Sequence, residues 1–447
     1  MTLSRSFGSL PQKRIANSAA ALFSHSAIYR FCIAFAVFDF LDIFDFLDSS
    51  SFNMPFKYCY AAIILGLMFV YVLKWKTIDT TSLAPIISLL FFFVMGLAFA
   101  LNFLIYDQRQ SYISAFVAAL VFSLSIVIPQ NAIMLDARRI TRDLTLLFSV
   151  GAVFYLVEAI VKPLDLVKNL VFLNEVQFLK SINCVLALSI CILTGRKTLA
   201  LFLAVVTVIA LILRPTSTLV LALICCLPLA VALRLRVLSL RPVAVSLSRA
   251  AAMTIWALAV IIPLLLYFFL DEIGPVINSV ESYLKVDVLG GQSNTSFRLA
   301  IMKYAFASFD NTSFLYGSAL SGDLSVLIAQ QFDWWINQNP NGLVSIHSDF
   351  VIVLVLMGII GYAFLSAMFF LMLKTRFREL VRFGVHGNGV VLHSISIIAV
   401  VALIVYCSVE PFLSYYNHAH VVWMLLLISE VARKTQIAAH SPIIRRS

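Results

Sequence analysis

The chain has 447 residues, of which 62% are hydrophobic and 12% are charged, and its mean hydropathy is +0.98. A soluble globular protein must cover its core with polar surface, so this composition excludes that class. The formal net charge of +10 comes from basic residues dispersed along the chain, which argues against a nucleic-acid partner. We therefore expect an all-α, polytopic integral membrane protein, because helices satisfy their own backbone hydrogen bonds in lipid and no barrel-like alternation occurs.

Apolar runs long enough to cross a bilayer, which takes roughly 20 helical residues, recur along the whole chain. They follow a polar head, residues 1–26, which lacks the features of a removable signal. Twelve transmembrane helices are expected after this head, at residues 27–47, 56–73, 82–104, 111–128, 143–161, 179–194, 197–213, 216–233, 251–270, 347–373, 390–409 and 413–430.

The distribution of Lys and Arg predicts the orientation, because basic residues near span ends are retained on the cytoplasmic side. With the polar head inside, 22 of the 32 basic residues fall on inner segments. Both termini are therefore expected in the cytoplasm. The predicted organisation is a cytoplasmic tail at 1–26, nine spans in 27–270, one large extracytoplasmic loop at 271–346, three spans in 347–430 and a second tail at 431–447.

The seven cysteines lie in or beside apolar spans and show no disulfide framework or metal-binding spacing. The histidines have no carboxylate at ligand spacing either. We therefore expect the cysteines to be small core residues, and we expect no metal and no cofactor.

A lone arginine, Arg214, is expected in a very short outer turn, beside Pro215 and a run of hydroxyl side chains. An arginine at the start of a helix can bind a phosphate bidentately, with help from the free backbone N–H groups. The alternative is that its side chain merely reaches the membrane interface. The sequence leaves these two readings open.

Two further basic residues, Arg298 and Lys303, lie in the otherwise acid-rich outer loop. The spacing of Phe297, Ile301 and Tyr304 predicts a short helix on the membrane surface, with the two basic side chains on different faces. Each is a candidate for an anion-binding site or for a simple ion pair.

The remaining candidates lie around the expected start of the tenth span. His347 can take a proton from a hydroxyl at ordinary pH, whereas Asp349 lies on another face of the helix and would orient something else. Glu410 is a carboxylate at the outer surface, between the last two spans. Trp334 and Trp335 offer aromatic faces that suit either sugar stacking or membrane anchoring.

Two stretches, SFRLAIMKYAFASFDNTSFLYGSALSG and NGLVSIHSDFVIVLVLMGIIGYAFL, carry a resemblance. Together they resemble the signature region of the bacterial O-antigen ligase and polysaccharide polymerase superfamily. In that family an Arg-bearing outer helix, a glycine turn, a His pair at the head of a helix and a Gly-x-x-Gly follow in this order. The matching positions here are Arg298, Phe314 to Leu320, His347 with Ser348, and Gly358 with Gly361.

The resemblance implies a membrane glycosyltransferase that polymerises polyprenyl-diphosphate-linked oligosaccharides into O-antigen or exopolysaccharide on the periplasmic face. The leaving group is then a lipid diphosphate, which fixed guanidinium groups can neutralise without a metal. Arg298 and Arg214 are expected in that role, with Lys303 as a weaker third.

His347 would deprotonate or orient the acceptor sugar hydroxyl, and Asp349 or Glu410 would bind sugar hydroxyls or steady the histidine. The expected partners are the lipid-linked donor and acceptor and membrane lipids, with a chain-length regulator as a further candidate. An O-antigen ligase that transfers polymer to a lipid A core is one alternative. A transporter or flippase of lipid-linked saccharides is another. Transporters usually place their charged sites near the midplane, whereas here Glu158 is the main acid within a span and the other polar candidates lie outside the spans.

Overall fold

The computed structural model of the chain describes residues 65–66, 68–69, 72–73, 82–106, 120–127, 137–161, 180–214, 216–239, 242–287, 301–302, 305–306, 313–317, 348–382, 388–410, 422–431 and 433. All regular structure in these ranges is helical. Five of the described helices are long and apolar enough to cross a membrane. The expected class, a helical membrane protein with several spans, is thereby confirmed. The full set of twelve spans stays a prediction, since the expected span at 27–47 lies outside the described residues.

The helix bounds agree with most of the expected spans that can be compared. The longer helices are α5 (Leu83–Tyr106), α7 (Ala137–Val161), α8 (Ile182–Thr194), α9 (Lys197–Leu213), α10 (Ser217–Ser239), α11 (Pro242–Asp287), α16 (Asp349–Arg382) and α17 (Asn388–Val409). Shorter elements are α6 (Leu120–Ser123), the 3-10 helix η2 (Leu124–Ile126) and α13 (Ser313–Tyr316), and a further apolar helix covers Val422–Val431.

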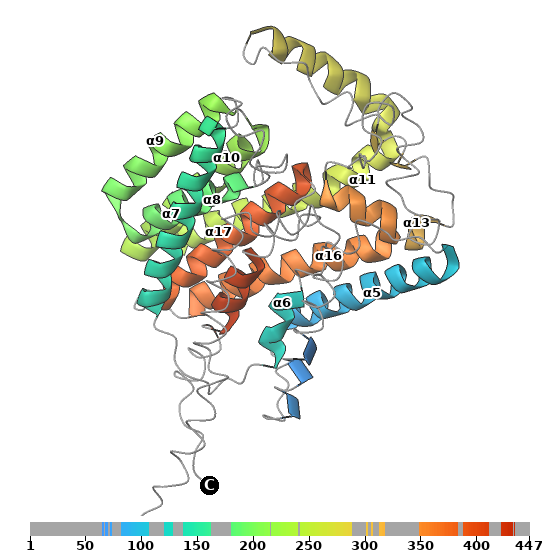
Figure 1. Cartoon of the computed structure of the whole chain (residues 1–447), viewed down its shortest axis with the longest axis horizontal. Coiled ribbons are helices and arrows are strands. Elements are labelled where there is room, and N and C mark those ends of the chain that lie inside the picture. Colours follow the sequence, from blue (N-terminus) through green and yellow to red (C-terminus); the bar gives the residue numbers. More distant parts are fainter. Residues whose placement is uncertain are drawn as a thin grey trace, which may run out of the picture.

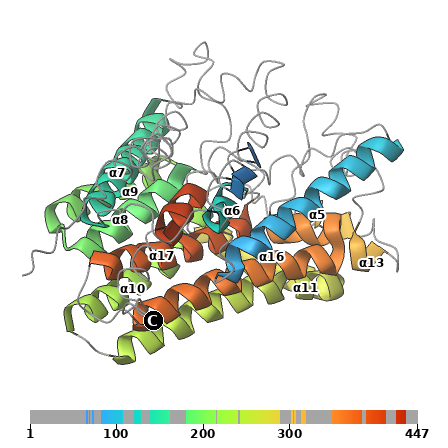
Figure 2. The same cartoon turned by 90° about the horizontal axis from the view of Figure 1, so that it is seen from below.

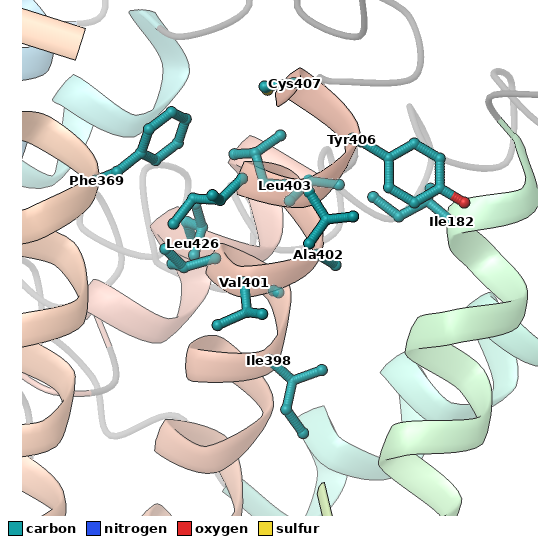
Figure 3. Close-up of a cluster of buried hydrophobic side chains, with 14 of the residues drawn as sticks. Ile182, Phe369, Ile398, Val401, Ala402, Leu403, Tyr406, Cys407 and Leu426 are labelled. Carbon is teal, nitrogen blue, oxygen red and sulfur yellow. The ribbon is translucent and has the colours of Figure 1, made fainter. Parts of the chain in front are cut away.

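Helix α17 forms the centre of the molecule. It packs against α16, α10, α8, α11 and α7, and Figures 1 and 2 show it running between the α7–α10 group and the α5–α16 pair. Its side chains from Leu392 to Cys407 are buried on all sides, among them Val401, Leu403 and Tyr406 (Figure 3). A helix that is hydrophobic all round is expected in such a buried position.

The outer helices show the opposite pattern, with apolar side chains on their exposed faces. In α9, Leu201, Val205, Val208 and Ile212 are all exposed, and their spacing of three or four residues places them on one face of the helix. A contiguous apolar face of this kind is unfavourable in water and favourable against lipid. The exposed faces therefore support a membrane-embedded bundle.

Helix α11 continues beyond the residue at which its span was expected to end. It is kinked at Phe269, which has φ −129° and ψ 24°, and contains Pro263 and Pro275. Proline lacks the N–H of an internal helical hydrogen bond, which favours a kink. The part after the kink turns away from α16 and projects beyond the bundle (Figure 1). The first residues of the expected loop, up to Asp287, are therefore helical.

A buried cluster of charges joins the end of α16 to the helix Val422–Val431. Arg376 lies 2.8 Å from Glu430, and Arg433 lies 2.7 Å from Glu430 and 3.7 Å from Glu379. All four side chains are nearly inaccessible to solvent. We call this the Arg433 cluster; its charges pair with one another, as buried charges must.

Candidate functional site

Polar side chains from several helices meet at the end of the bundle where α16 begins, here called the Ser348 end. The Ser348 hydroxyl donates to the carbonyl of Cys407 over 3.2 Å, and the hydroxyls of Ser181 and Tyr406 lie 2.6 Å apart. The start of α16, the end of α17 and the start of α8 are therefore neighbours. The Arg433 cluster lies at the other end of α16, roughly 40 Å of helical rise away.

An ion pair between α7 and the start of α8 is buried at the Ser348 end. Lys180 Nζ donates to Glu158 Oε1 over 2.8 Å, and the two side chains are 2% and 5% exposed. Removing two charges from water is costly, so such a pair persists only when each charge satisfies the other. Ionisable groups in this position commonly mark substrate or ion sites in membrane proteins.

Arg214 lies in the short turn between α9 and α10, as the sequence predicts. It ends α9 by donating its backbone N–H to the carbonyl of Ala210 over 2.8 Å. Its Nη1 atom is buried and has no hydrogen-bond partner among the described residues. A guanidinium nitrogen without a partner in the interior is costly, and Arg214 therefore stays a candidate for anion binding.

Tyr155 connects the ion pair with the α9–α10 turn. Its side chain is fully buried on α7, its hydroxyl faces Thr216, and Arg214 and Glu158 are close enough to interact with it electrostatically. We call Tyr155, Glu158, Lys180, Arg214 and Thr216 the Tyr155 cluster. Among the described residues, Glu158 Oε2 and Arg214 Nη1 have no hydrogen-bond partner, and the hydroxyls of Tyr155 and Thr216 lie within hydrogen-bonding reach of each other.

The central helix α17 closes the cluster on one side. The Tyr406 ring projects from α17 toward α8, with its hydroxyl pointing to the helix that carries Ile182 (Figure 3). There the hydroxyl meets Ser181, the neighbour of Lys180. The Glu158–Lys180 pair is thus held between α7 and the start of α8, and helices position a site more accurately than loops do.

Two of the sequence-predicted carboxylates lie at the same end. Glu410 is 4% exposed, directly after α17, and its Oε1 accepts a hydrogen bond of 2.9 Å from the Thr218 hydroxyl of α10. Asp349 is fully buried at the start of α16 and faces the Cys407 thiol of α17. The structure therefore brings Arg214, Glu410 and Asp349 to one end of the bundle.

The other predicted site residues, Arg298, Lys303, His347, Trp334 and Trp335, lie outside the described residues. Two short helical pieces beside them are described, 301–302 and 305–306, and their side chains are buried. Phe306 packs edge-on against Tyr267 of α11, with ring centroids 5.2 Å apart. The segment predicted as a membrane-surface helix therefore packs against the protein where it is described.

The two glycine motifs named in the resemblance are in direct contact. Gly317 follows α13 with a positive φ of 77° and lies against the backbone of Leu356 and Gly358 in α16. Gly358 itself has φ 61° and ψ −163°, which interrupts the helix. Both conformations favour glycine, since a Cβ would be strained there. The sequence predicts the motifs but not their contact.

Sequence reasoning missed Tyr155 and Lys180, whereas it named the Thr216 hydroxyl as a neighbour of Arg214. Lys180 carried a usable signal, because a lysine at the expected start of one span and Glu158 near the end of the preceding span must lie at the same end of an antiparallel pair. Tyr155 carried none, since an aromatic residue in an apolar helix is most often part of the core.

The cluster combines donors and acceptors suited to a polar, anionic ligand. Arg214 supplies a guanidinium donor, Tyr155 and Thr216 supply hydroxyls, and Glu158 supplies a free carboxylate oxygen. Within the described ranges no group of three or more His, Cys, Asp or Glu residues could hold a metal ion. In comparisons with known proteins, no protein-family model matches the chain, and no curated protein matches it.

Proposed function

We propose that the protein is a membrane glycosyltransferase that polymerises polyprenyl-diphosphate-linked oligosaccharide repeat units on the extracytoplasmic face of a bacterial inner membrane. The observation that supports it best is the Nη1 atom of Arg214, in the turn before α10, which is buried and has no hydrogen-bond partner among the described residues. The basic-residue rule predicts that this end of the bundle faces away from the cytoplasm. An anion-binding arginine at that level of the membrane suits a diphosphate carried on a lipid tail.

The diphosphate is dianionic in the donor and gains a further negative charge as it leaves, so charge neutralisation is the main catalytic requirement. A guanidinium preorganised in a low-dielectric site stabilises charge as it develops, without reorganisation at the moment of reaction. The first N–H groups of α10 add to this, because they have no partner within the helix. In the proposal Arg214 and Arg298 share this task, and Lys303 assists.

The reaction joins the acceptor hydroxyl oxygen to the anomeric carbon of the donor. As that bond forms, the bond from the anomeric carbon to the diphosphate oxygen breaks, and the electron pair leaves with the lipid diphosphate. The proton of the acceptor hydroxyl passes to His347, which directly precedes Ser348 in the sequence. Trp334 and Trp335 provide stacking faces for the sugars.

The two described carboxylates take supporting roles. Asp349 is buried against α17 and serves to fix the start of α16, and with it the position of His347. Glu410 already accepts a hydrogen bond from Thr218, so it anchors the start of α10 and retains acceptor capacity for a sugar hydroxyl.

The test uses the full-length protein in liposomes, supplied with undecaprenyl-diphosphate-linked oligosaccharide repeat units. A polymerase produces a ladder of lengthening products, which Arg214→Ala abolishes and Arg214→Lys restores in part, because lysine keeps the charge but not the bidentate geometry. Arg249→Ala is the matched control, since Arg249 is exposed on α11 and should leave the ladder unchanged. A wild-type protein that makes no ladder refutes the proposal.

A transporter of lipid-linked saccharides is the second candidate, supported by the buried Glu158–Lys180 pair. The same vesicles discriminate the two, because a transporter moves the lipid-linked units across the bilayer without lengthening them. A ligase shares the chemistry of the polymerase. Adding a lipid A core acceptor distinguishes it, since only a ligase attaches the saccharide there.

A further inference from the structure

The outer loop is attached to the bundle at an aromatic ring of α11. Tyr267 packs edge-on against Phe306, with ring centroids 5.2 Å apart, and stacks on Phe314 of α13, with ring centroids 5.3 Å apart. Phe306 and Phe314 both belong to the stretch that is expected as the large extracytoplasmic loop. Tyr267 therefore joins two separate pieces of that loop to α11.

The loop side of this contact is a buried apolar face. Ile301, Met302, Ala305 and Phe306 are helical and buried, and their spacing matches one face of a helix. Aromatic pairs such as Phe306 with Tyr267 contribute stability beyond the apolar area that they bury. The segment thus docks on the bundle through this face.

The bundle side of the contact is fixed to α16 by two hydrogen bonds. The Tyr362 hydroxyl donates to the carbonyl of Val260 over 2.5 Å. The indole N–H of Trp256 donates to the carbonyl of Ser366 over 3.0 Å. Tyr267 precedes the kink of α11, so it belongs to the part of that helix which is bonded to the bundle.

A second contact fixes the end of the docked segment. Helix α13 lies beside α16 in both views (Figures 1 and 2), and Gly317 lies against the backbone of Leu356 and Gly358. Leu356 is seven residues into α16, which is roughly 10 Å of helical rise from the start of that helix. The segment is therefore held near the Ser348 end, where the polar side chains of the candidate site meet.

We propose that Tyr267 is a positioning residue, which holds the outer-loop segment, and with it Arg298, beside the start of α16. Arg298 precedes Ile301 by three residues, and three residues of chain reach at most roughly 11 Å even when fully extended. Docking of Ile301 therefore limits how far Arg298 can move from the bundle. The role of Arg298 at the diphosphate rests on the proposed function, and Tyr267 acts through Arg298.

The first measurement is limited trypsin cleavage of the purified full-length protein in detergent, with the cut after Lys303 followed by mass spectrometry. Lys303 stands between the buried pairs 301–302 and 305–306, so a cut there requires the segment to undock. Tyr267→Ala removes two ring contacts and should speed this cut at least about fivefold. Tyr267→Phe keeps the ring and should leave the rate of cleavage unchanged.

Trp256→Ala is the matched control for this measurement. Trp256 is also a half-buried aromatic residue of α11, but its ring packs against Phe370 of α16, with centroids 5.0 Å apart. Its removal takes an aromatic contact from the same helix without touching the described loop pieces. The cut after Lys303 should therefore keep its wild-type rate.

The second measurement is growth of the saccharide ladder in the liposome assay, at saturating donor and per amount of folded protein. Tyr267→Ala should slow it at least about tenfold, because a small displacement of a charge-stabilising group is costly to the rate. Tyr267→Phe should restore it, and Trp256→Ala should leave it unchanged. A merely structural role of Tyr267 would lower the yield of folded protein without changing the rate of the protein that folds.

Cleavage that is no faster in Tyr267→Ala than in Trp256→Ala overturns the inference and leaves the proposed function standing. Faster cleavage with an unchanged ladder also overturns it, since the docked segment would then not position Arg298. If Tyr267→Ala yields no folded protein, Phe314→Ala removes the stacked ring from the loop side and carries the same test. A wild type that makes no ladder overturns the proposed function and the inference together.

Discussion

Substitution of Gly317 by Ala is expected to destabilise the protein strongly, and the reason can be worked out from two separate terms. Gly317 has φ +77°, a conformation that costs a residue with a Cβ about 1–2 kcal/mol. The added Cβ would also overlap with the backbone C and O of Leu356 and lie 2.5 Å from the N of Gly358. Moving α16 away adds an overpacking cost of about 1–3 kcal/mol. The total is about 2–5 kcal/mol.

The measurement is the thermal unfolding midpoint of the purified protein in detergent, followed by size-exclusion chromatography after heating. Gly96→Ala is the matched control, because Gly96 lies within α5 and a Cβ there meets nothing within 4 Å. Alanine is the better helix former by about 0.5–1 kcal/mol, so this variant should be unchanged or slightly more stable. If Gly317→Ala unfolds at the same temperature as Gly96→Ala, the contact between α13 and α16 is not as described.

Three further predictions concern buried polar groups, and the same unfolding assay measures them. Lys180→Met should lower the free energy of unfolding by about 3–5 kcal/mol, because it leaves the Glu158 carboxylate unpaired. Adding Glu158→Leu should recover much of this loss, and a double variant that recovers none would contradict the pairing. Arg433→Met should cost a similar amount of stability, because the Arg433 side chain is buried. The Arg378 side chain is 61% exposed, so Arg378→Met should cost at most about 1 kcal/mol. Equal losses in the two variants would contradict the burial of Arg433. Thr218→Val removes a hydrogen bond of 2.9 Å to a carboxylate and should cost about 1.5–3 kcal/mol, and an unchanged midpoint would show that the bond contributes nothing.

The sequence predicts the positions of the helices well where apolar length alone decides them. The span expected at 197–213 coincides with α9, and that at 143–161 lies within α7. It also predicts the turn that holds Arg214 and the common end of Arg214, Asp349 and Glu410. These follow from counting apolar residues and from the alternation of antiparallel spans.

The prediction of helix ends fails where a polar stretch of the chain is helical. The residues after Phe269 are polar enough to suggest a loop, yet α11 runs on to Asp287. A hydropathy pattern reports where a chain leaves the hydrocarbon, and a helix can continue into the polar region because its backbone bonds are internal. The kink at Phe269, one residue before the expected end of the span, marks that transition.

The composition of the candidate site could not be predicted from the sequence, because it depends on which faces of the helices meet. Tyr155 is one aromatic residue among many in apolar runs. It lies three residues before Glu158 on α7 and so on the same face of that helix, but only the packing of α7 against α8 and α9 places it near Arg214. The contact between Gly317 and Gly358 has the same origin. The position of a residue within its span predicts its depth in the membrane, but its neighbours on other helices depend on how the helices pack.

The two polar clusters differ in how their charges are paired. In the Arg433 cluster the charges of Arg376, Glu379, Glu430 and Arg433 form ion pairs with one another, although both Glu379 oxygens have no hydrogen-bond partner among the described residues. In the Tyr155 cluster Glu158 pairs with Lys180, whereas the Nη1 atom of the half-buried Arg214 has no hydrogen-bond partner in the described part of the chain. An unsatisfied buried group costs about 1–3 kcal/mol. A diphosphate bound to Arg214, as proposed above, would offset that cost at the Ser348 end.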